Sequence, residues 1–541
     1  MPSARVEKAN LGGANPARGL FPMWLLISAL GLCLGSAAAQ VCPTRPAPGS
    51  TVEDPFAVYN NGNGVLKVDL TASNFLQSGF ILYCYAYPAN GTEAPTLRLN
   101  PGDELILNLT NQMQQFFAQL PQHAHPLALP PMADPDCAGY MTSYSTNVHF
   151  HGLNLPPQCH QDETIFTLIN PGDPPFRYQT RIPHDEPPGL YWYHPHPHGM
   201  TQAQIMGGAS GALIVEGIEK VKPEVAGLTE HVFVLRDQTS PVTGGLMTTI
   251  NFVPAISPYP VIQTGPSEKQ FWRVLNAEGE TFVRLQVQIN GQPQKVEMVA
   301  LDGTPLKTNI VTTEVDLPPA GRAEFIMQGP AEGATGALVT LGVNTGPAGT
   351  PNPPQQFADI VPTGGAKVRS KAVSPVPLPG TEQRFAGLAN LKVNQKRSLY
   401  FSEYLSNDPG DSKFYVTVQG QTPQEFDPSE PPAIVTQQGS VEDWTIENRT
   451  HEIHAFHIHQ VHFLLLARNR VSEALAKILD TVDIPAWSGS GPYPSVTIRM
   501  DFRDPQAVGT FVYHCHILNH EDQGMMAKIQ VLPPSTSPPP Q

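Results

Sequence analysis

Charge and cysteine are both scarce in this chain. Only 15% of its 541 residues are charged, the net charge is -15, and no block of lysine and arginine occurs. An acidic chain without a basic patch lacks the electrostatic footprint of a nucleic-acid-binding protein. Beyond the first 39 residues, no stretch is apolar and long enough to span a membrane. The composition therefore argues against nucleic acid as a partner and predicts no membrane span in the mature chain.

Residues 1–39 have the pattern of a signal peptide. Arg5, Lys8 and Arg18 precede the apolar run "LFPMWLLISALGLCLG", and small residues precede Gln40. The apolar run is short and is followed by alanines, which favours cleavage after Ala39 over a retained membrane anchor. We therefore expect a secreted or periplasmic protein.

The six cysteines are unevenly distributed. Cys33 leaves with the signal peptide, and Cys515 stands more than 350 residues after the others. The remaining four are Cys42, Cys84, Cys137 and Cys159. Four cysteines allow three pairings in an oxidising compartment, and we expect the pairs Cys42–Cys84 and Cys137–Cys159. Cys515 needs another explanation.

Long amphipathic helices are also lacking, whereas proline (58) and glycine (45) are abundant. This balance favours an all-β protein made of short strands. A plan of short strand, turn and longer strand ending in Asn occurs in residues 96–113, 260–291 and 431–459. Three such units predict three related β-domains.

The domain limits follow from composition. Residues 348–380 are rich in Pro, Gly and Ser without periodicity, which is typical of a linker. We expect domains at 40–222, 223–375 and 376–541. The segment "RVSEALAKILDTV", residues 470–482, is the best candidate for a helix.

Ten of the 18 histidines fall into four short segments that each contain His-x-His. They are His149, His151, His194, His196, His454, His457, His459, His514, His516 and His520. On a strand, residues i and i+2 point to the same face, so each pair presents two imidazoles together. Four converging pairs predict a site for several metal ions. We interpret His123 and His125 as a loop feature, and His198 as a neighbour of the ligands.

The segment "FVYHCHILNHEDQGMM", residues 511–526, adds a thiol to this pattern. On a strand, Cys515 faces away from His514 and His516, so the cysteine and its neighbours can serve different metal centres. A cysteine with two histidines and a distant methionine is the ligand set of a blue-copper site, whereas zinc prefers four strong ligands. Met525 fits the axial position by spacing, and Met526 is the alternative.

These four segments resemble the copper-binding signatures of multicopper oxidases, from "HFHG" near 150 to "HCHILNHEDQGMM" near 520. The resemblance spans the mature chain and implies three cupredoxin-like Greek-key β-sandwich domains. It also implies copper in domain three and at the interface of domains one and three.

Carried over residue by residue, the resemblance assigns the ligands of four coppers. The type 1 copper would take His454, Cys515, His520 and Met525, and the type 2 copper would take His149 and His457. The type 3 pair would share His151, His194, His196, His459, His514 and His516. Ala455 replaces the proline that usually follows the first histidine of the third signature, and we expect no loss of copper.

The resemblance also implies two acids that deliver protons, for which Asp162 and Glu521 are the best matches. Glu163 is the neighbour that leaves the first of these assignments open. The implied function is a laccase-like oxidase that couples four one-electron oxidations of phenols or aromatic amines to reduction of O2 to water. The alternatives are a metallo-oxidase of Cu(I) or Fe(II), and a copper-binding or electron-transfer protein without turnover. The reducing substrate and the oligomeric state stay open.

Overall fold

The computed structural model describes residues 42–60, 62–116, 137, 139–240, 245–363, 384–407 and 411–534. The predicted signal peptide and the pair His123 and His125 lie outside the described residues. None of the helices in the described ranges has the length and apolar character needed to cross a membrane.

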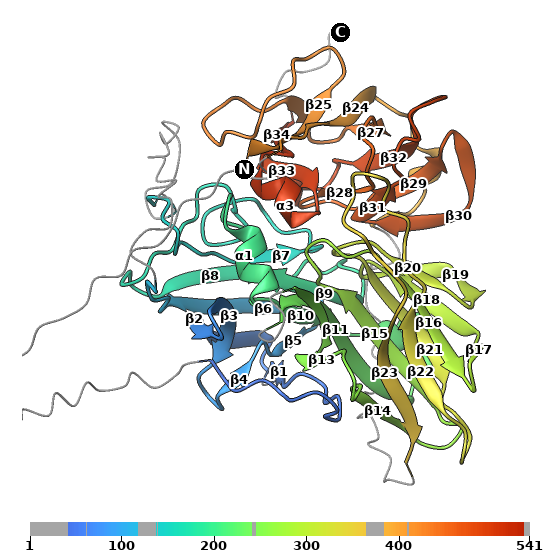
Figure 1. Ribbon diagram of the computed structural model, residues 1–541. Helices are drawn as coiled ribbons and strands as arrows, with labels where there is room; N and C mark the ends of the chain where they lie inside the picture. The colour runs from blue at the N-terminus through green and yellow to red at the C-terminus, as the bar shows by residue number, and fades with distance from the viewer. Residues whose placement is uncertain are drawn as a thin grey trace, which may run out of the picture. The chain divides into compact units, whose positions relative to one another are not determined.

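The strands of the described residues form six sheets, two from each of three consecutive stretches of chain (Figure 1). We call these pairs of sheets the first, middle and last sandwiches. The first contains β1 (Ala57–Tyr59), β2 (Val65–Gln77), β3 (Phe80–Tyr87), β4 (Thr92–Glu93), β5 (Thr96–Leu99), β6 (Glu104–Asn111), β7 (His149–His151), β8 (Phe176–Arg181), β9 (Gly189–His194) and β10 (Gly211–Val215). The middle contains β11 (Thr229–Thr239), β12 (Leu246–Ile250), β13 (Val253–Pro254), β14 (Val261–Thr264), β15 (Lys269–Asn276), β16 (Val283–Ile289), β17 (Gln292–Pro293), β18 (Val296–Leu301), β19 (Thr304–Thr312), β20 (Val315–Leu317), β21 (Arg322–Gln328), β22 (Gly336–Thr340) and β23 (Gln355–Pro362). The last contains β24 (Gln395–Tyr404), β25 (Lys413–Val418), β26 (Ile434–Gln437), β27 (Val441–Asn448), β28 (His454–Ile458), β29 (Phe463–Arg468), β30 (Val471–Leu479), β31 (Thr481–Ile484), β32 (Ser495–Asp501), β33 (Gly509–Cys515) and β34 (Met526–Leu532).

Helices are few and short in the described residues. They are α1 (Thr201–Met206), α2 (Ile218–Val221), α3 (Leu518–Asp522) and the 3-10 turns η2 (Pro223–Val225), η3 (Leu388–Asn390) and η5 (Pro505–Ala507). Each sandwich instead encloses its own hydrophobic core between its two sheets. Consecutive strands such as β5 and β6 lie in opposite sheets, as in a Greek key. The predicted all-β fold of three sandwiches is confirmed.

The repeated sequence plan corresponds to a repeated structure. The pairs β5–β6, β14–β15 and β26–β27 each cross from one sheet to the other, and each longer strand pairs in parallel with an earlier strand. Each longer strand ends in an asparagine: Asn111, Asn276 and Asn448. In all three, the side-chain amide donates to backbone carbonyls, and its oxygen accepts from the backbone N–H two residues on. The same turn therefore leaves the same strand in each sandwich.

Two predictions of local structure are wrong. Residues 470–482 form no helix, because Val471–Leu479 is strand β30, the edge partner of β29. Asn469 and Arg470, both with positive φ, make the turn of this hairpin. Strand pairing overrides the helix propensity of the Ala, Leu, Glu and Lys residues in this segment. The predicted linker at 348–380 is wrong for residues 355–362, which form strand β23 and pair with β22 and β14, and its part from residue 364 lies outside the described residues.

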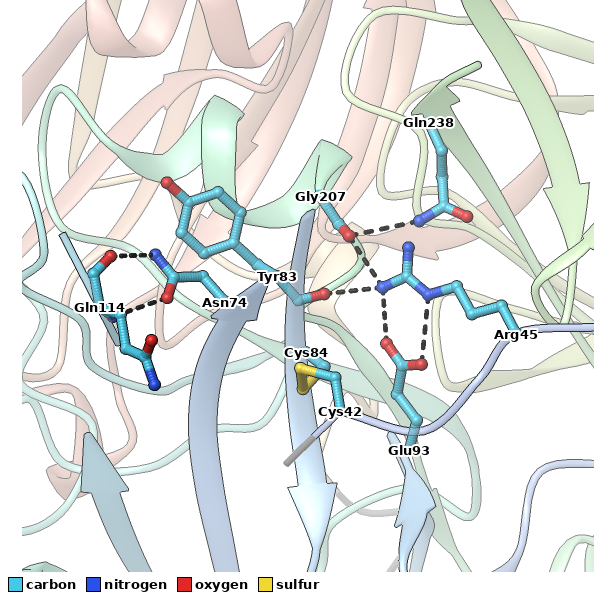
Figure 2. The surroundings of a disulfide bond; sticks show 9 residues. All are labelled: Cys42, Arg45, Asn74, Tyr83, Cys84, Glu93, Gln114, Gly207 and Gln238. Atoms are coloured by element: carbon cyan, nitrogen blue, oxygen red, sulfur yellow. Dashed lines mark hydrogen bonds and ion pairs between the residues drawn. A yellow bond between two sulfur atoms is a disulfide. The ribbon is translucent and has the colours of Figure 1, made fainter. Parts of the chain in front are cut away.

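Both predicted disulfides, Cys42–Cys84 and Cys137–Cys159, are present. The first fastens an N-terminal strap, residues 42–56, to β3 (Figure 2). The strap contacts the first sandwich where Phe56 O accepts from Thr96 N–H, and the middle sandwich where Val52 N–H donates to Val261 O. In the strap, Arg45 forms a partly buried ion pair with Glu93 and donates to the carbonyls of Tyr83 and Gly207. Gly207 ends α1, so the strap braces the helix that follows the histidine segment 194–198.

Candidate metal centre

Strand alternation distributes the His-Cys-His triplet between different neighbours. Cys515 is the last residue of β33, which pairs with β28 so that His457 lies opposite His514 and Phe456 lies opposite Cys515. Cys515 therefore faces the core of the last sandwich, whereas His514 and His516 face the first sandwich. The predicted division of the triplet is what the strand register produces.

On the core side, the Cys515 thiol lies close to two histidines, His454 and His520. Its Sγ is 3.4 Å from His454 Nδ1 and 3.9 Å from His520 Nδ1, and the two Nδ1 atoms are 3.3 Å apart. His520 belongs to α3, which directly follows β33 (Figure 1). Met525 is fully buried in the same core cluster as Cys515, whereas Met526 pairs with His514 on the opposite face. The register thus favours Met525 over Met526 as the neighbour of the sulfur.

On the other side, eight histidines from the first and last sandwiches form one buried cluster. Three groups of nitrogen atoms lie close enough to share a metal ion: His149–His151–His457, His151–His194–His516 and His196–His459–His514. The rings of His151 and His457 stack at 3.9 Å, and those of His149 and His459 stack at 3.8 Å. Each stack joins a histidine of β7 to one from the last sandwich, so the cluster exists only where the two sandwiches meet.

The hydrogen bonds of the imidazoles fit a set of metal ligands. In several rings one nitrogen meets an oxygen atom, as in His194 Nδ1 to the Pro195 carbonyl, His457 Nδ1 to the Asp480 carbonyl and His454 Nε2 to Thr450 Oγ1. The other nitrogen faces the neighbouring imidazoles, and the buried Nε2 atoms of His149 and His457 have no hydrogen-bond partner. An oxygen acceptor fixes one N–H and leaves the opposite lone pair available for a metal ion.

Burial keeps these imidazoles uncharged. Desolvation, with repulsion from neighbouring histidines, lowers the pKa of His194 to about 3 and that of His196 to about 4. Desolvation also raises the pKa of the Cys515 thiol. Neutral imidazoles are ready ligands, and a buried thiolate is stabilised when a cation binds it. This donor set of imidazole nitrogens with one thiol and one thioether suits copper.

Asp162 and Glu163, which the sequence could not separate, have different surroundings. Asp162 is buried, its two carboxylate oxygens lie 3.0 Å from His149 Nδ1, and it accepts hydrogen bonds from Phe150 N and Gln460 Nε2. Glu163 accepts only from its own loop, at residues 165–167. The geometry therefore favours Asp162 as the acid beside the cluster.

Glu521 is fully buried beside other histidines of the cluster. Its Oε2 is 3.1 Å from His514 Nδ1, and its Oε1 is 3.4 Å from His196 Nε2. Burial raises the pKa of Glu521, whereas His514 and His196 lower it. The effect of the two histidines is larger, so the pKa of Glu521 lies below its usual range. His198 lies outside the three groups of nitrogens, with its ring against Phe426.

Sequence reasoning missed two acids that contact the histidines. Asp480 lies 3.3 Å from His151 Nε2, and Glu452 lies 3.2 Å from His520 Nε2. Burial and the neighbouring Glu403 raise the pKa of Glu452 to about 10. Neither acid belongs to a motif, and Asp480 lay at the end of the segment that was predicted to be a helix. Each acid is identified only by its distance from a histidine in the folded chain.

Three β-sandwiches, with histidines at the meeting of the first and last and a His-Cys-His strand between two metal-ligand groups, define a copper-binding oxidoreductase of the cupredoxin-like class. The comparisons agree with this class. Two family models, both described as multicopper oxidase, match residues 140–220 and 401–535.

Relatives match most of the chain at low identity. The multicopper oxidase mco of Staphylococcus haemolyticus is 25% identical and covers 87% of this chain and 89% of its own length. A laccase of Bacillus subtilis is 23% identical, covering 72% of this chain and 80% of its own. Among solved structures, a multicopper oxidase of Campylobacter jejuni described as a metallo-oxidase aligns with a TM-score of 0.65 at 20% identity, covering 90% of this chain and 96% of its own. The chain belongs to the multicopper oxidase family, whose members are oxidoreductases that use oxygen as the acceptor.

Proposed function

We propose that this protein is a laccase-like oxidase that couples four one-electron oxidations of a phenol or aromatic amine to the reduction of O2 to water. The observation that carries the proposal is the division of residues 514–516 between the group that contains the thiol and the histidine cluster. Cys515 lies with His454 and His520, while the histidines on either side lie with two different histidine groups. One peptide bond on each side of Cys515 thus joins the two centres.

We assign the ligands on this geometry. Cys515, His454, His520 and Met525 would hold the type 1 copper, and His149 and His457 would hold the type 2 copper. The two type 3 coppers would take His151, His194 and His516, and His196, His459 and His514. Support comes from the close approach of these nitrogens and from the unpartnered buried Nε2 atoms. When bound, these coppers supply one-electron redox chemistry and a site for dioxygen.

The chain itself would supply protons and exclude water. Asp162 and Glu521 contact different histidines of the cluster, Asp162 through His149 and Glu521 through His514 and His196. Each acid would place a carboxylate oxygen close to the site where O2 is reduced. From there it would give or accept a proton, which is the role of a general acid or base. The complete burial of the cluster histidines keeps bulk water from the metals.

The surroundings of His520 indicate where the electron donor binds. His520 is 5% exposed, the only one of the four proposed type 1 ligands that is not fully buried, and Glu452 covers its Nε2. Glu452 would bind the hydroxyl group of a phenolic donor here, and the copper that His520 would help to hold would supply the one-electron oxidation. The same position also favours a second candidate function. Glu452, Glu403 and Glu280 interact electrostatically, so they would attract a cationic donor such as Fe(II) or Cu(I).

Oxygen uptake by the copper-loaded protein separates these functions. A phenolic donor, Fe(II) and Cu(I) are compared, with copper counted per chain and with Glu452→Gln beside the wild type. We expect the fastest uptake with the phenol. Preference for a metal ion that Glu452→Gln abolishes would instead establish the metallo-oxidase. Copper-loaded protein that consumes no oxygen with any donor would contradict both.

We also propose that residues 1–39 direct export and that the domains end near residues 222 and 375. The two disulfides support an oxidising compartment, and the division of the sheets supports these limits.

A further inference from the structure

Asp480, between β30 and β31, makes contacts with two histidines of the cluster. Its carboxylate Oδ1 is 3.3 Å from His151 Nε2, and its backbone carbonyl accepts a hydrogen bond of 2.8 Å from His457 Nδ1. The rings of these two histidines are stacked in parallel. One residue of the last sandwich therefore determines the orientation of an imidazole from each of the two sandwiches.

Asp480 is itself held by the middle sandwich, which contributes none of the ten histidines. Arg322, the first residue of β21, donates from Nη1 to Asp480 Oδ1 at 2.7 Å and from Nη2 to Oδ2 at 2.5 Å. Asp302 of the same sandwich accepts from the backbone N–H of Asp480 at 3.3 Å and of Thr481 at 3.4 Å. Arg322 and Asp480 are both fully buried, so the forked ion pair has a fixed geometry.

The glycine after the first His-x-His supports the same arrangement. Gly152 has a φ of +88°, and a Cβ atom there would lie 2.5 Å from Arg322 Nη2 and 2.7 Å from Asp480 Oδ2. Any larger residue would displace the ion pair. The backbone that carries His151 is therefore shaped to the Arg322–Asp480 pair, and not only to the imidazoles.

We propose that Arg322 and Asp480 are positioning residues of the histidine cluster, through which the middle sandwich controls the metal ligands. This inference rests on the proposed copper cluster. Asp480 fixes the proton of His151 on Nε2 and that of His457 on Nδ1. The free lone pairs are then His151 Nδ1, which lies 3.4 Å from His194 Nε2, and His457 Nε2, which has no other partner. Arg322 keeps the Asp480 carboxylate in the one rotation that serves His151.

A pair of Arg→Lys variants tests this role. Arg322→Lys keeps the positive charge but loses the fork, so the Asp480 carboxylate can rotate away from His151. The matched control is Arg273→Lys, because Arg273 forms an equally buried ion pair with Glu324 in the same sheet, without contact to a histidine. Copper content, competition with a chelator and electron paramagnetic resonance are measured on each copper-loaded protein, together with the thermal unfolding temperature.

We expect Arg322→Lys to weaken copper binding at the cluster by about tenfold or more and to change the paramagnetic resonance of the cluster copper, because His151 loses its fixed hydrogen-bond partner. The absorption of the Cys515-bound copper should stay unchanged. Arg273→Lys should lose stability without either effect. Unchanged cluster affinity and resonance in Arg322→Lys would overturn the inference.

Asp480→Asn provides a second test, which also decides the matter if Arg322→Lys does not fold. The amide has a single acceptor oxygen, so it cannot serve His151 and both arms of Arg322. It should show the same change of the cluster resonance, and an unchanged resonance would overturn the inference. Wild-type protein without cluster copper would instead refute the proposed function itself.

Discussion

Glu521 and Asp522 are adjacent in α3, both carry a carboxylate, and the structure assigns them different surroundings. Glu521 points to the cluster, with Oε2 at 3.1 Å from His514 Nδ1. Asp522 points to the start of α1, where it accepts from the backbone N–H groups of Gly199, Thr201 and Gln202. Replacing each by its amide therefore separates a role in proton delivery from a role in stability.

The size of the expected effects follows from these contacts. In Glu521, Oε2 lies 3.1 Å from His514 Nδ1, and Oε1 lies 3.4 Å from His196 Nε2 and can carry a proton. An amide keeps the shape but cannot transfer a proton, so Glu521→Gln should reduce kcat by roughly 100-fold, about 2.7 kcal/mol in activation free energy. Asp522→Asn keeps one acceptor oxygen and should cost about 1–3 kcal/mol of folding stability, with turnover per bound copper unchanged.

Stopped-flow absorption measures the two half-reactions separately. Anaerobic reduction by the donor reports the Cys515-bound copper, and this step should be the same in all three proteins. Reoxidation by O2 should be slow only in Glu521→Gln. If Glu521→Gln retains full copper and reoxidises within about twofold of the wild type across the pH range, Glu521 is not a proton donor.

Four further expectations follow from other contacts. Cys515→Ser should abolish the visible thiolate–copper absorption and oxidase turnover, while copper held only by histidines remains detectable by paramagnetic resonance; retained turnover would contradict the electron path. The Cys42→Ser/Cys84→Ser double variant should be about 4 kcal/mol less stable from the loss of a 42-residue loop constraint, and denaturant unfolding without such a shift would contradict this. Burial, then Glu403, raises the pKa of Glu452 to about 10. The protonated form is therefore favoured in the folded state, and its stabilising contribution is lost as pH rises above the ordinary range towards 10, so in copper-depleted protein Glu452→Gln should raise the unfolding temperature more at pH 9 than at pH 5. Removal of copper by a chelator should lower the unfolding temperature reversibly, because metal binds the folded chain; no change on readdition would argue against native copper sites.

The sequence predicted the parts of the site that depend on local geometry. Strand alternation alone placed Cys515 opposite His514 and His516, because the period of a strand is two residues. The three Asn-ended strands were visible for the same reason, since each unit is a short local pattern. Both disulfides join successive cysteines along the chain, Cys42 with Cys84 and Cys137 with Cys159.

The rest depends on contacts between distant segments. Asp480 meets His151 across 329 residues of sequence, and no local pattern indicates such a pairing. Residues 470–482 have the composition of a helix, but the hairpin turn at Asn469 and Arg470 and the pairing with β29 determine a strand. The choice between Asp162 and Glu163 was also invisible, because it depends on which carboxylate reaches His149.

The N-terminal strap has a consequence for the order in which the protein is built. Val52 belongs to the core of the middle sandwich, and its N–H donates to the Val261 carbonyl, more than 200 residues later. At usual rates of synthesis, this partner emerges roughly 10–40 s after the strap. The Cys42–Cys84 bond requires only the first sandwich, so it can form during this interval. The disulfide would then tether the strap to the first sandwich. This tether keeps Val52 at a high local concentration while the middle sandwich assembles around it.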